Sequence, residues 1–417
     1  MGVTTLRILI VCGFLSGTGA RAVQNRRLAR ALAAAKGNVV SVLSFDKDGD
    51  GQPGNTQFPV LPDEIEVVRF LPPPTTIIRK VNLFHSAALN RAAAEFTQNF
   101  IYPKSDLLIG ALRRRVAEFH PDIVIFISYP YFVPLLGLQL ERLNGMRTIA
   151  FFSDPWPYRH MPSPYNRYNF PLTGNYEKHL ISKIYAHFDR ILYTNSSAVE
   201  FMFASYPELK RNSNKLAIAA HFADEVIETP SKEIVERVRS SVVHIGELTK
   251  ERFTPQLKTS IAQCINTHGM SFTFIGGVCK KLKQSLARGE FGSGVSHLGS
   301  LPDTFCRYIA NTASVNLIVE ADIRNSPFLP SKLTDVLTSS DRWVFVSGTR
   351  RQPDVGIAPA GAASGICVPH ESSAIVNAIL AVARSGPVNG DPCVESLRAA
   401  AIERNRILSA KFLDSSI

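Results

Sequence analysis

The stretch SPFLPSKLTDVLTSSDRWVFVS, residues 326–347, contains the features that decide the fold of the second half of the chain. Pro330 and Ser331 predict the start of a helix, where the Ser331 hydroxyl is available to cap free N–H groups. Apolar residues then recur at the spacing of one buried helix face, namely Leu333, Val336 and Leu337. The serine pair that follows ends the helix, and WVFV at 343–346 predicts a buried strand.

Two charged residues lie on one face of this predicted helix. Lys332 is in its first turn and Asp335 lies one turn further on. Free N–H groups, the positive end of the helix dipole and the ammonium group together favour an anion. Asp335 is placed to accept hydrogen bonds from hydroxyl groups beside that anion, so the pattern predicts a phosphate held next to a sugar. The alternative is an ordinary exposed ion pair, worth about 0.2–0.5 kcal/mol.

Composition bounds the class of protein. A chain of 417 residues is long enough for two domains, each with its own core. With 45% hydrophobic and 19% charged residues it is globular rather than disordered. The net charge of +11 indicates an anionic partner, such as a nucleotide or a phospholipid surface. No recognisable nucleic-acid-binding module accompanies the charge, so we expect no nucleic-acid partner.

Cysteine usage and hydropathy favour a cytoplasmic protein. The six cysteines form no C-x-x-C pair and have no histidine at metal-ligand spacing, which indicates small core residues in a reducing compartment. No apolar run reaches the roughly 18 residues that a membrane span needs. The apolar run after Arg7 is short and leads into a basic helix, so it fits a strand and loop better than a signal peptide.

The first 45 residues predict a strand, a loop, a helix and a second strand. The strands cover 6–12 and 38–45 and the helix covers 21–35, and a right-handed crossover between them implies a parallel sheet. Gly17 and Gly19 in the loop allow a backbone to approach a ligand closely. The G-x-G-x-x-G spacing of dinucleotide-binding loops is not completed, so a plain tight turn explains the loop equally well.

A basic, helical segment follows at 79–115. Such a segment can lie on an anionic membrane surface, with about 1 kcal/mol contributed by each Lys or Arg near the lipid. The inner face of the membrane is therefore a candidate peripheral partner. A solvated helix face explains the same charges, and it is the explanation we favour.

Strand patterns continue on both sides of a charged stretch at 226–240. They lie at 65–71, 123–127, 147–152, 188–194 and 215–220, and then at 241–246, 272–275, 295–298, 315–319, 343–346 and 366–368. Two such arrays predict an α/β protein with two Rossmann-like domains facing a cleft. The predicted parts are a first domain at 1–222, a linker at 223–240, a second domain at 241–390 and a C-terminal helix at 391–417 that crosses back to the first domain.

The strand at 147–152 ends in SDPWP, residues 153–157. Loops at the carboxyl ends of parallel strands are where α/β proteins place ligand contacts. Asp154, Trp156 and His160 together suit a sugar, which offers a flat apolar face and hydroxyl groups. A rigid turn in which Asp154 caps the next helix is the alternative.

The P-S-K-L-T-D segment at Pro330 resembles the C-terminal-domain segment of GT-B glycosyltransferases, especially of family 4, where P-S-K-[LI]-x-[DE]-x-L precedes a short strand. D-P-W-P at Asp154 and the strand at 188–197 are similar to family 4 segments, so the resemblance covers nearly the whole chain. I-G-E-L-T-K-E-R at Ile245 stands where the family has G-R-L-x-x-x-K. The resemblance implies the GT-B architecture and a nucleotide-sugar donor held by the second domain.

The resemblance also implies roles for single residues. Arg252 and Lys332 would hold the donor diphosphate. The family has two glutamates separated by seven residues, written E-x7-E, and Asp335 stands in place of the second one. Asp335 would accept hydrogen bonds from the donor ribose. Pro327 stands in place of the first of those glutamates, and Glu247 in place of a phosphate-binding arginine. The F-I-G-G and H-L-G-S-L-P segments match glycine-containing segments of the family. The remaining donor-site residues are then Ser331, Gly276, Leu298 and Gly299.

A retaining transfer follows from the same resemblance, with the departing diphosphate stabilised by positive charge. Because Arg and Lys supply that charge, we expect neither a metal nor a cofactor beyond the donor. The acceptor would be a saccharide or a lipid-linked sugar, in polysaccharide or glycolipid assembly. Asp154 or His160 would orient it or assist proton transfer, with Gly17, Gly19 and Trp156 on the acceptor side.

Two other functions fit the same architecture. One is a non-catalytic nucleotide-sugar-binding protein, which intact binding without transfer or donor hydrolysis would indicate. The other is an epimerase or another sugar-nucleotide enzyme, which would process the donor with no acceptor added.

Overall fold

The structure is a computed structural model of the chain. It describes residues 5–15, 19–45, 61–62, 64–69, 102–141, 145–157, 160–165, 174–349, 365–384 and 392–413. Gly17 and the part of the basic segment at 79–101 lie outside the described residues.

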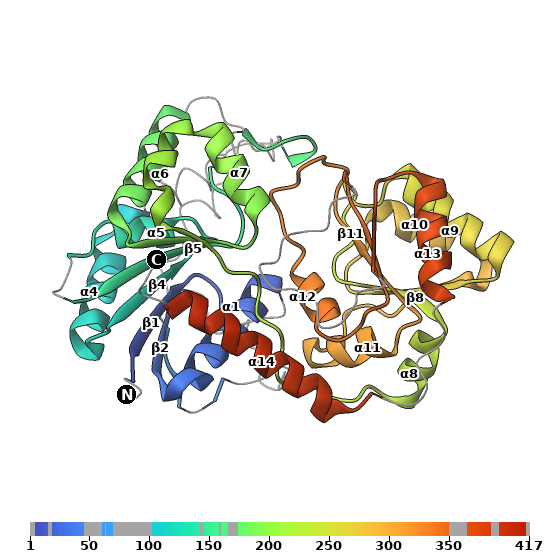
Figure 1. The fold of residues 1–417 in the computed structure, drawn as a ribbon, viewed down its shortest axis with the longest axis horizontal. Coiled ribbons are helices and arrows are strands. Elements are labelled where there is room, and N and C mark those ends of the chain that lie inside the picture. The colour runs from blue at the N-terminus through green and yellow to red at the C-terminus, as the bar shows by residue number, and fades with distance from the viewer. Residues whose placement is uncertain are drawn as a thin grey trace, which may run out of the picture. The chain divides into compact units, whose positions relative to one another are not determined.

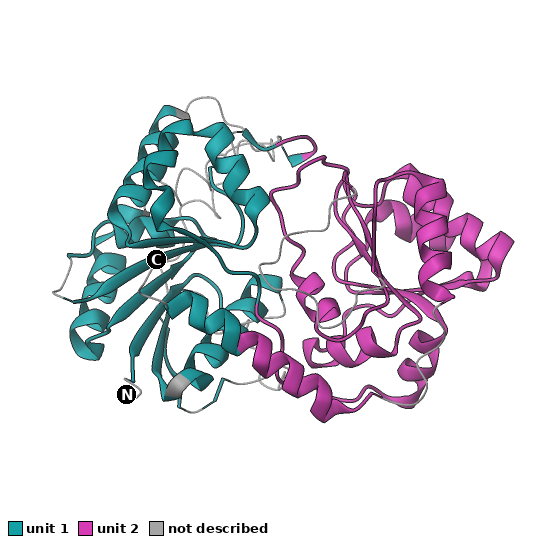
Figure 2. Cartoon of the chain, in the orientation of Figure 1, with its two compact units in different colours: residues 1–161, 165–221, 406–417 teal, residues 162–164, 222–405 magenta. Residues whose placement is uncertain are grey.

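The chain divides into two compact units (Figure 2). Residues 1–161, 165–221 and 406–417 form unit 1, and residues 162–164 and 222–405 form unit 2. Helix α14 (Val394–Leu413) therefore begins among the residues of unit 2 and ends among those of unit 1. The stretch at 223–240, expected to be a linker, belongs to unit 2 and contains helix α8 (Lys232–Arg239).

Unit 1 is built on a seven-stranded sheet with the order β3-β2-β1-β4-β5-β6-β7 (Figure 1). Every neighbouring pair is parallel. The strands are β1 (Arg7–Cys12), β2 (Val39–Ser44), β3 (Glu66–Arg69), β4 (Ile123–Ile127), β5 (Arg147–Phe152), β6 (Arg190–Tyr193) and β7 (Leu216–Ile218). The strand order reverses between β1 and β4, and ligands of open α/β sheets bind beyond the carboxyl ends of the strands at such a point.

Helices cover both faces of this sheet. The helices are α1 (Ala20–Ala34), α4 (Asp106–Phe119), α5 (Phe132–Gly137), α6 (Gly174–His187) and α7 (Ser196–Ser205). On one face, α4, α5 and α6 share an apolar core with strand residues such as Leu9 and Phe126. On the other face, Phe412 of α14 contacts Phe151 edge-on, with the ring centroids 5.2 Å apart. Ser409 of the same helix donates to the Ala31 carbonyl of α1, so these two helices lie side by side.

Unit 2 is built on a six-stranded sheet with the order β10-β9-β8-β11-β12-β13, again entirely parallel. The strands are β8 (Ser241–Ile245), β9 (Ser271–Ile275), β10 (Val295–His297), β11 (Val315–Val319), β12 (Trp343–Val346) and β13 (Ile366–Val368). The order reverses between β8 and β11, which makes their carboxyl ends the expected ligand position of this unit.

The helices of unit 2 also lie on both sides of their sheet. They are α8, α9 (Pro255–His268), α10 (Lys280–Ala287), α11 (Cys306–Thr312), α12 (Ser331–Leu337) and α13 (Ser372–Ala383). One face carries α9, α10 and α13, which pack on strand residues such as Phe272 and Leu317. The opposite face carries α8 and α11, which pack on Val243 and Ile275.

The predicted fold class is confirmed: the chain is an α/β protein with two Rossmann-like, parallel-sheet domains. Helix α12 begins at Ser331 as predicted, but the expected cap by the Ser331 hydroxyl is wrong. Pro330 occupies the N-cap position and has no side-chain acceptor, so Ser331 is the first helical residue. Across the described parts of the chain, no helix has the length and apolar character to cross a membrane.

Candidate active site

Three glycines follow three neighbouring strands at the carboxyl edge of unit 2. Gly246, Gly276 and Gly299 come after β8, β9 and β10 and have φ angles of 127°, 110° and 69°. The N–H of Gly276 donates to the Gly299 carbonyl at 2.7 Å. A Cβ on Gly276 would overlap the Gly246 carbonyl, so only glycine fits there. The His297 ring contacts the Gly276 carbonyl at 2.8 Å, and the predicted Leu298 is partly buried in an apolar cluster.

The two predicted phosphate-binding cations meet at the Gly246 turn. Arg252 Nη1 donates to the Glu247 carbonyl at 3.2 Å. Lys332 Cγ lies 3.6 Å from the position that a Cβ on Gly246 would take. Each side chain is 22% exposed. The structure thus brings Arg252 and Lys332 to a single turn at the point where the strand order of unit 2 reverses.

Each of these cations faces a buried carboxylate. Arg252 Nη2 lies 3.0 Å from Glu320 Oε2, and Lys332 Nζ lies 3.5 Å from Asp335 Oδ2. Lys332 Nζ is also 3.1 Å from the sulfur of Cys306. The ion pair that was the alternative explanation of Lys332 and Asp335 is therefore present. It is not an ordinary surface pair, because the Asp335 side chain is only 1% exposed.

Glu320 is a site residue that the sequence analysis missed. It directly follows β11 and is fully buried. Its Oε1 accepts from the Ala321 N–H at 2.8 Å, and its carbonyl accepts from His370 Nε2 at 2.8 Å. The Nδ1 atom of the same His370 ring lies 3.0 Å from the Thr254 hydroxyl. Glu320 thereby fixes the direction of the Arg252 guanidinium, and an acid directly after VNLIV was the signal that could have found it.

Arg404 of α14 is a second missed residue. It is 6% exposed. Burial lowers the pKa of Arg404 to about 10, the charge of Asp335 opposes that lowering, and Arg307 adds to it. Arg307 is itself fully buried and donates to the Ser339 hydroxyl and the Thr338 carbonyl. The carboxylate of Asp335 therefore lies in the field of Arg404 as well as of Lys332. No sequence spacing connects these residues.

In unit 1, Asp154 forms an ion pair with Arg21 of α1. The same guanidinium donates to the Ser153 hydroxyl. Arg21 was given no role in the sequence analysis. The predicted acidic group at the end of β5 is thus held by a cation from the helix that follows β1.

The predicted contact of Trp156 with a sugar is wrong. Its ring is 2% exposed and stacks on Tyr131 with centroids 5.7 Å apart, so it belongs to the core and cannot offer a flat surface to a sugar. His160 is exposed and contacts the Tyr206 ring edge-on at 5.3 Å. Gly19 is the N-cap of α1 with φ −62°, and no atom lies within 4 Å of the place its Cβ would take. The chain itself therefore does not demand glycine at position 19.

The basic segment contributes one of its arginines to the packing of unit 1. In its described part, Arg113 and Arg114 are exposed on α4, whereas Arg115 is buried and pairs with Glu66 and the Ser41 hydroxyl. Arg115 therefore fastens α4 to the sheet and is not available to a membrane.

No protein-family model matches the chain, and no curated protein matches it in sequence. Solved structures do match. HepE from Anabaena, in complex with UDP and glucose, has a TM-score of 0.57 and 12% identity, covering 98% of this chain and 96% of that chain. Sucrose-phosphate synthase from Thermosynechococcus elongatus has a TM-score of 0.63 and 12% identity, with 96% and 94% covered. A glycosyltransferase from Rickettsia africae has a TM-score of 0.54 and 11% identity, with 97% and 96% covered. The chain has the GT-B fold.

Unit 2 of this GT-B chain also contains a buried histidine. His244 is on β8, two residues before Gly246, and is 5% exposed. Its Nδ1 is 2.9 Å from the Leu317 carbonyl, to which it donates. Burial lowers the pKa of His244 to about 4, the bond to Leu317 opposes that lowering, and the charge of Arg252 adds to it. The ring is therefore neutral at pH 7.

We expect His244 to make unit 2 sensitive to acid. The pKa of about 4 in the folded state is below the usual 6.5, so the unfolded chain takes up a proton first as the pH falls. The free energy of unfolding should therefore drop between pH 6.5 and 4, with about 3 kcal/mol due to this residue. Urea unfolding across that range, compared with His244→Gln, isolates the contribution. Identical pH slopes in the two proteins would contradict the assignment.

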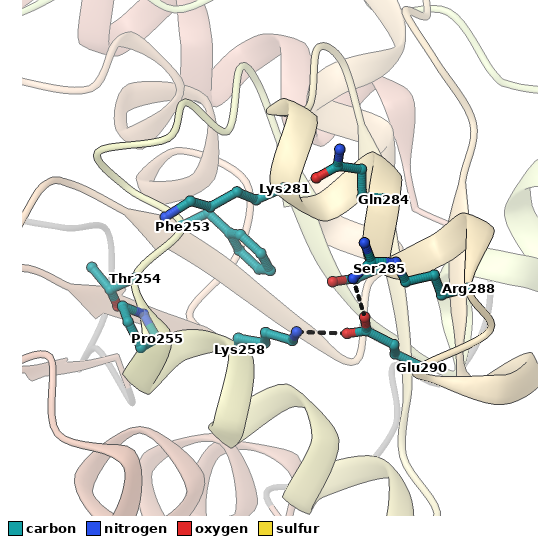
Figure 3. A pocket seen from close by; sticks show the side chains of 9 residues that line it. All are labelled: Phe253, Thr254, Pro255, Lys258, Lys281, Gln284, Ser285, Arg288 and Glu290. Atoms are coloured by element: carbon teal, nitrogen blue, oxygen red, sulfur yellow. Dashed lines mark ion pairs between the residues drawn. The ribbon is translucent and has the colours of Figure 1, made fainter.

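A cavity of about 230 Å³ lies beside α9 and α10 in the GT-B chain's second unit (Figure 3). Lys258 and Glu290 point toward one another across it and pair at 2.5 Å, and Arg288 lies 3.6 Å from the same carboxylate. The cavity shares no residue with the predicted donor site. Within the described residues, no group of three or more His, Cys, Asp or Glu side chains is placed to hold a metal ion.

Proposed function

We propose that this GT-B protein is a retaining glycosyltransferase of the family 4 type. It moves a sugar from a nucleotide-sugar donor to a saccharide or lipid-linked acceptor, in polysaccharide or glycolipid biosynthesis. The proposal includes a cytoplasmic location, with the exposed basic residues of α4 as the candidate contact with an anionic membrane surface.

One observation carries this proposal: Arg252 and Lys332 converge on the Gly246 turn, where the strand order of unit 2 reverses. A diphosphate needs two or more cationic donors, and each charged hydrogen bond contributes about 1.5–3 kcal/mol. The glycines that follow β8 and β10, Gly246 and Gly299, carry no side chain that would cover the backbone at this edge. Structures of HepE in complex with UDP and with UDP-glucose make uridine nucleotides the first donors to test.

In the proposed reaction, the bond between the anomeric carbon and the diphosphate oxygen breaks and the acceptor hydroxyl oxygen bonds to that carbon. The hydroxyl proton passes to the departing diphosphate. Arg252 and Lys332 stabilise the negative charge that develops on the leaving group, which is the largest effect we assign to the protein. Because these side chains supply the charge, the proposal needs no metal. The expected contact of Asp335 with the donor ribose is not part of the proposal, because this carboxylate is 1% exposed and pairs with Lys332 instead. Asp154 or His160 orients the acceptor.

The test is a mass-spectrometric screen of UDP-, GDP- and ADP-sugars for release of the free nucleoside diphosphate. We expect release from one donor class, and a product whose anomeric configuration matches the donor. No binding of any nucleoside diphosphate at low salt would contradict the proposal.

A non-catalytic nucleotide-sugar-binding protein is the second candidate. It is favoured by the pairing of Arg252 with Glu320 and of Lys332 with Asp335. The two carboxylates offset part of the positive charge that catalysis would need to stabilise a departing diphosphate. Tight diphosphate binding with no turnover of any donor would select this candidate.

A further inference from the structure

Two exposed aromatic rings stand at the carboxyl edge of the sheet of unit 1. Phe14 follows β1 and is 37% exposed, and Tyr129 follows β4 and is 39% exposed. Their rings stack with centroids 5.8 Å apart and planes 25° apart. We call this pair the aromatic platform. It lies between β1 and β4, where the strand order reverses and where α/β folds bind ligands.

The backbone of Tyr129 and the packed side chains next to it fix the position of the platform. Tyr129 has a φ of 67°, a left-handed conformation that is strained for a bulky residue. Its ring meets Tyr131 edge-on at 5.7 Å, and Tyr131 stacks on the buried Trp156. A Cβ on Gly13 would overlap the Pro130 ring, so the two loops are in direct contact. A strained backbone that is fixed by a packed core is typical of functional positions.

The Arg21 guanidinium lies over part of the platform, above the Tyr129 ring. The Arg21 guanidinium carbon is 5.5 Å from the centre of the Tyr129 ring. The same guanidinium pairs with Asp154, and the two side chains are 29% and 21% exposed. Both side chains are therefore partly open to solvent beside the rings.

We propose that the aromatic platform and the Arg21–Asp154 pair bind one pyranose ring of the acceptor. A pyranose has an apolar C–H face that covers an aromatic ring and a rim of hydroxyls that seeks charged partners. The aromatic platform packs against the C–H face of the pyranose. Asp154 accepts hydrogen bonds from the sugar hydroxyls, and Arg21 donates hydrogen bonds to them. This inference rests on the proposed function and makes it narrower: the reacting end of the acceptor is a sugar rather than a lipid alcohol.

The experiment is saturation-transfer NMR with methyl β-glucopyranoside, methyl β-galactopyranoside and methyl α-mannopyranoside, without nucleotide. We expect transfer to the protons of one C–H face of at least one glycoside. Tyr129→Ala and Phe14→Ala should weaken its binding about threefold to tenfold. Tyr129→Phe and Phe14→Tyr, which keep the rings, should bind as the wild type does. Val39→Ala, at an exposed apolar residue at the amino end of β2, serves as the control.

Several outcomes would overturn the platform. These are the absence of transfer to any glycoside, equal affinities of the alanine variants and the wild type, or equal platform-dependent transfer to hexanol. UDP titration of the same variants should be unchanged, because the donor site lies in unit 2. Circular dichroism and urea unfolding like those of the wild type show that unit 1 of each variant is folded. Because the NMR assay contains no nucleotide, failure of the donor site leaves its result intact.

Discussion

Lys332→Ala is expected to weaken nucleoside-diphosphate binding by about 1.5–3 kcal/mol, because it removes a charged hydrogen-bond donor from the Gly246 turn. We expect a further loss of about 10²–10³-fold in kcat, since negative charge grows on the departing diphosphate during transfer. Calorimetric titration gives the first quantity and steady-state release of nucleotide gives the second. The two losses together form the largest effect that we predict for a single substitution.

The matched control for Lys332 is Lys283→Ala, an exposed lysine on α10 in the same unit. It removes the same charge from unit 2 without touching the site, and we expect affinity and kcat to stay at wild-type levels. An equal loss in both variants would show that only the overall charge matters, and an unchanged affinity in Lys332→Ala would remove the assigned role.

Glu320→Ala is expected to lower the free energy of unfolding of unit 2 by about 3–5 kcal/mol, because it leaves the Arg252 guanidinium without its buried partner. The double variant Arg252→Ala/Glu320→Ala should be less destabilised than the sum of the two single variants. Trp343 lies on β12 of unit 2 and is 1% exposed, so its fluorescence in urea is a local probe once Trp156 of unit 1 is replaced by phenylalanine in every protein compared. Nucleotide affinity should also fall in Glu320→Ala, since Arg252 loses its orientation.

Glu290→Ala is the comparison for this measurement. Glu290 also pairs with two cations, Lys258 and Arg288, but its side chain is 28% exposed and solvent weakens such pairs. We expect little change in stability. If Glu320→Ala costs no more than Glu290→Ala, the buried pair does not hold the site together.

Much of the fold could be predicted from the sequence, because its strands are continuous apolar runs. The strands at 123–127, 315–319 and 343–346 have the predicted bounds. In contrast, α6 and α10 received no assignment. The sequence KKLKQSLA of α10 buries only Leu282 and Ser285, which is too few apolar positions to mark a helix face.

The candidate site could be predicted from the sequence only in part. Lys332 and Asp335 lie one helical turn apart, so their meeting follows from local spacing. Arg252 and Glu320 are 68 positions apart and meet only because β8 and β11 are neighbours in the sheet. Trp156 was misjudged because nothing local distinguishes an aromatic residue that stacks on Tyr131 in the core from one that faces a ligand.

The central claim is that Arg252 and Lys332 together hold a diphosphate. The most direct measurement is the ratio of two affinities, that for the best-bound nucleoside diphosphate and that for its nucleoside, in the wild type and in Arg252→Ala/Lys332→Ala. We predict that the wild type strongly prefers the diphosphate and that the double variant binds the two ligands almost equally. A double variant that keeps the wild-type preference would contradict the account.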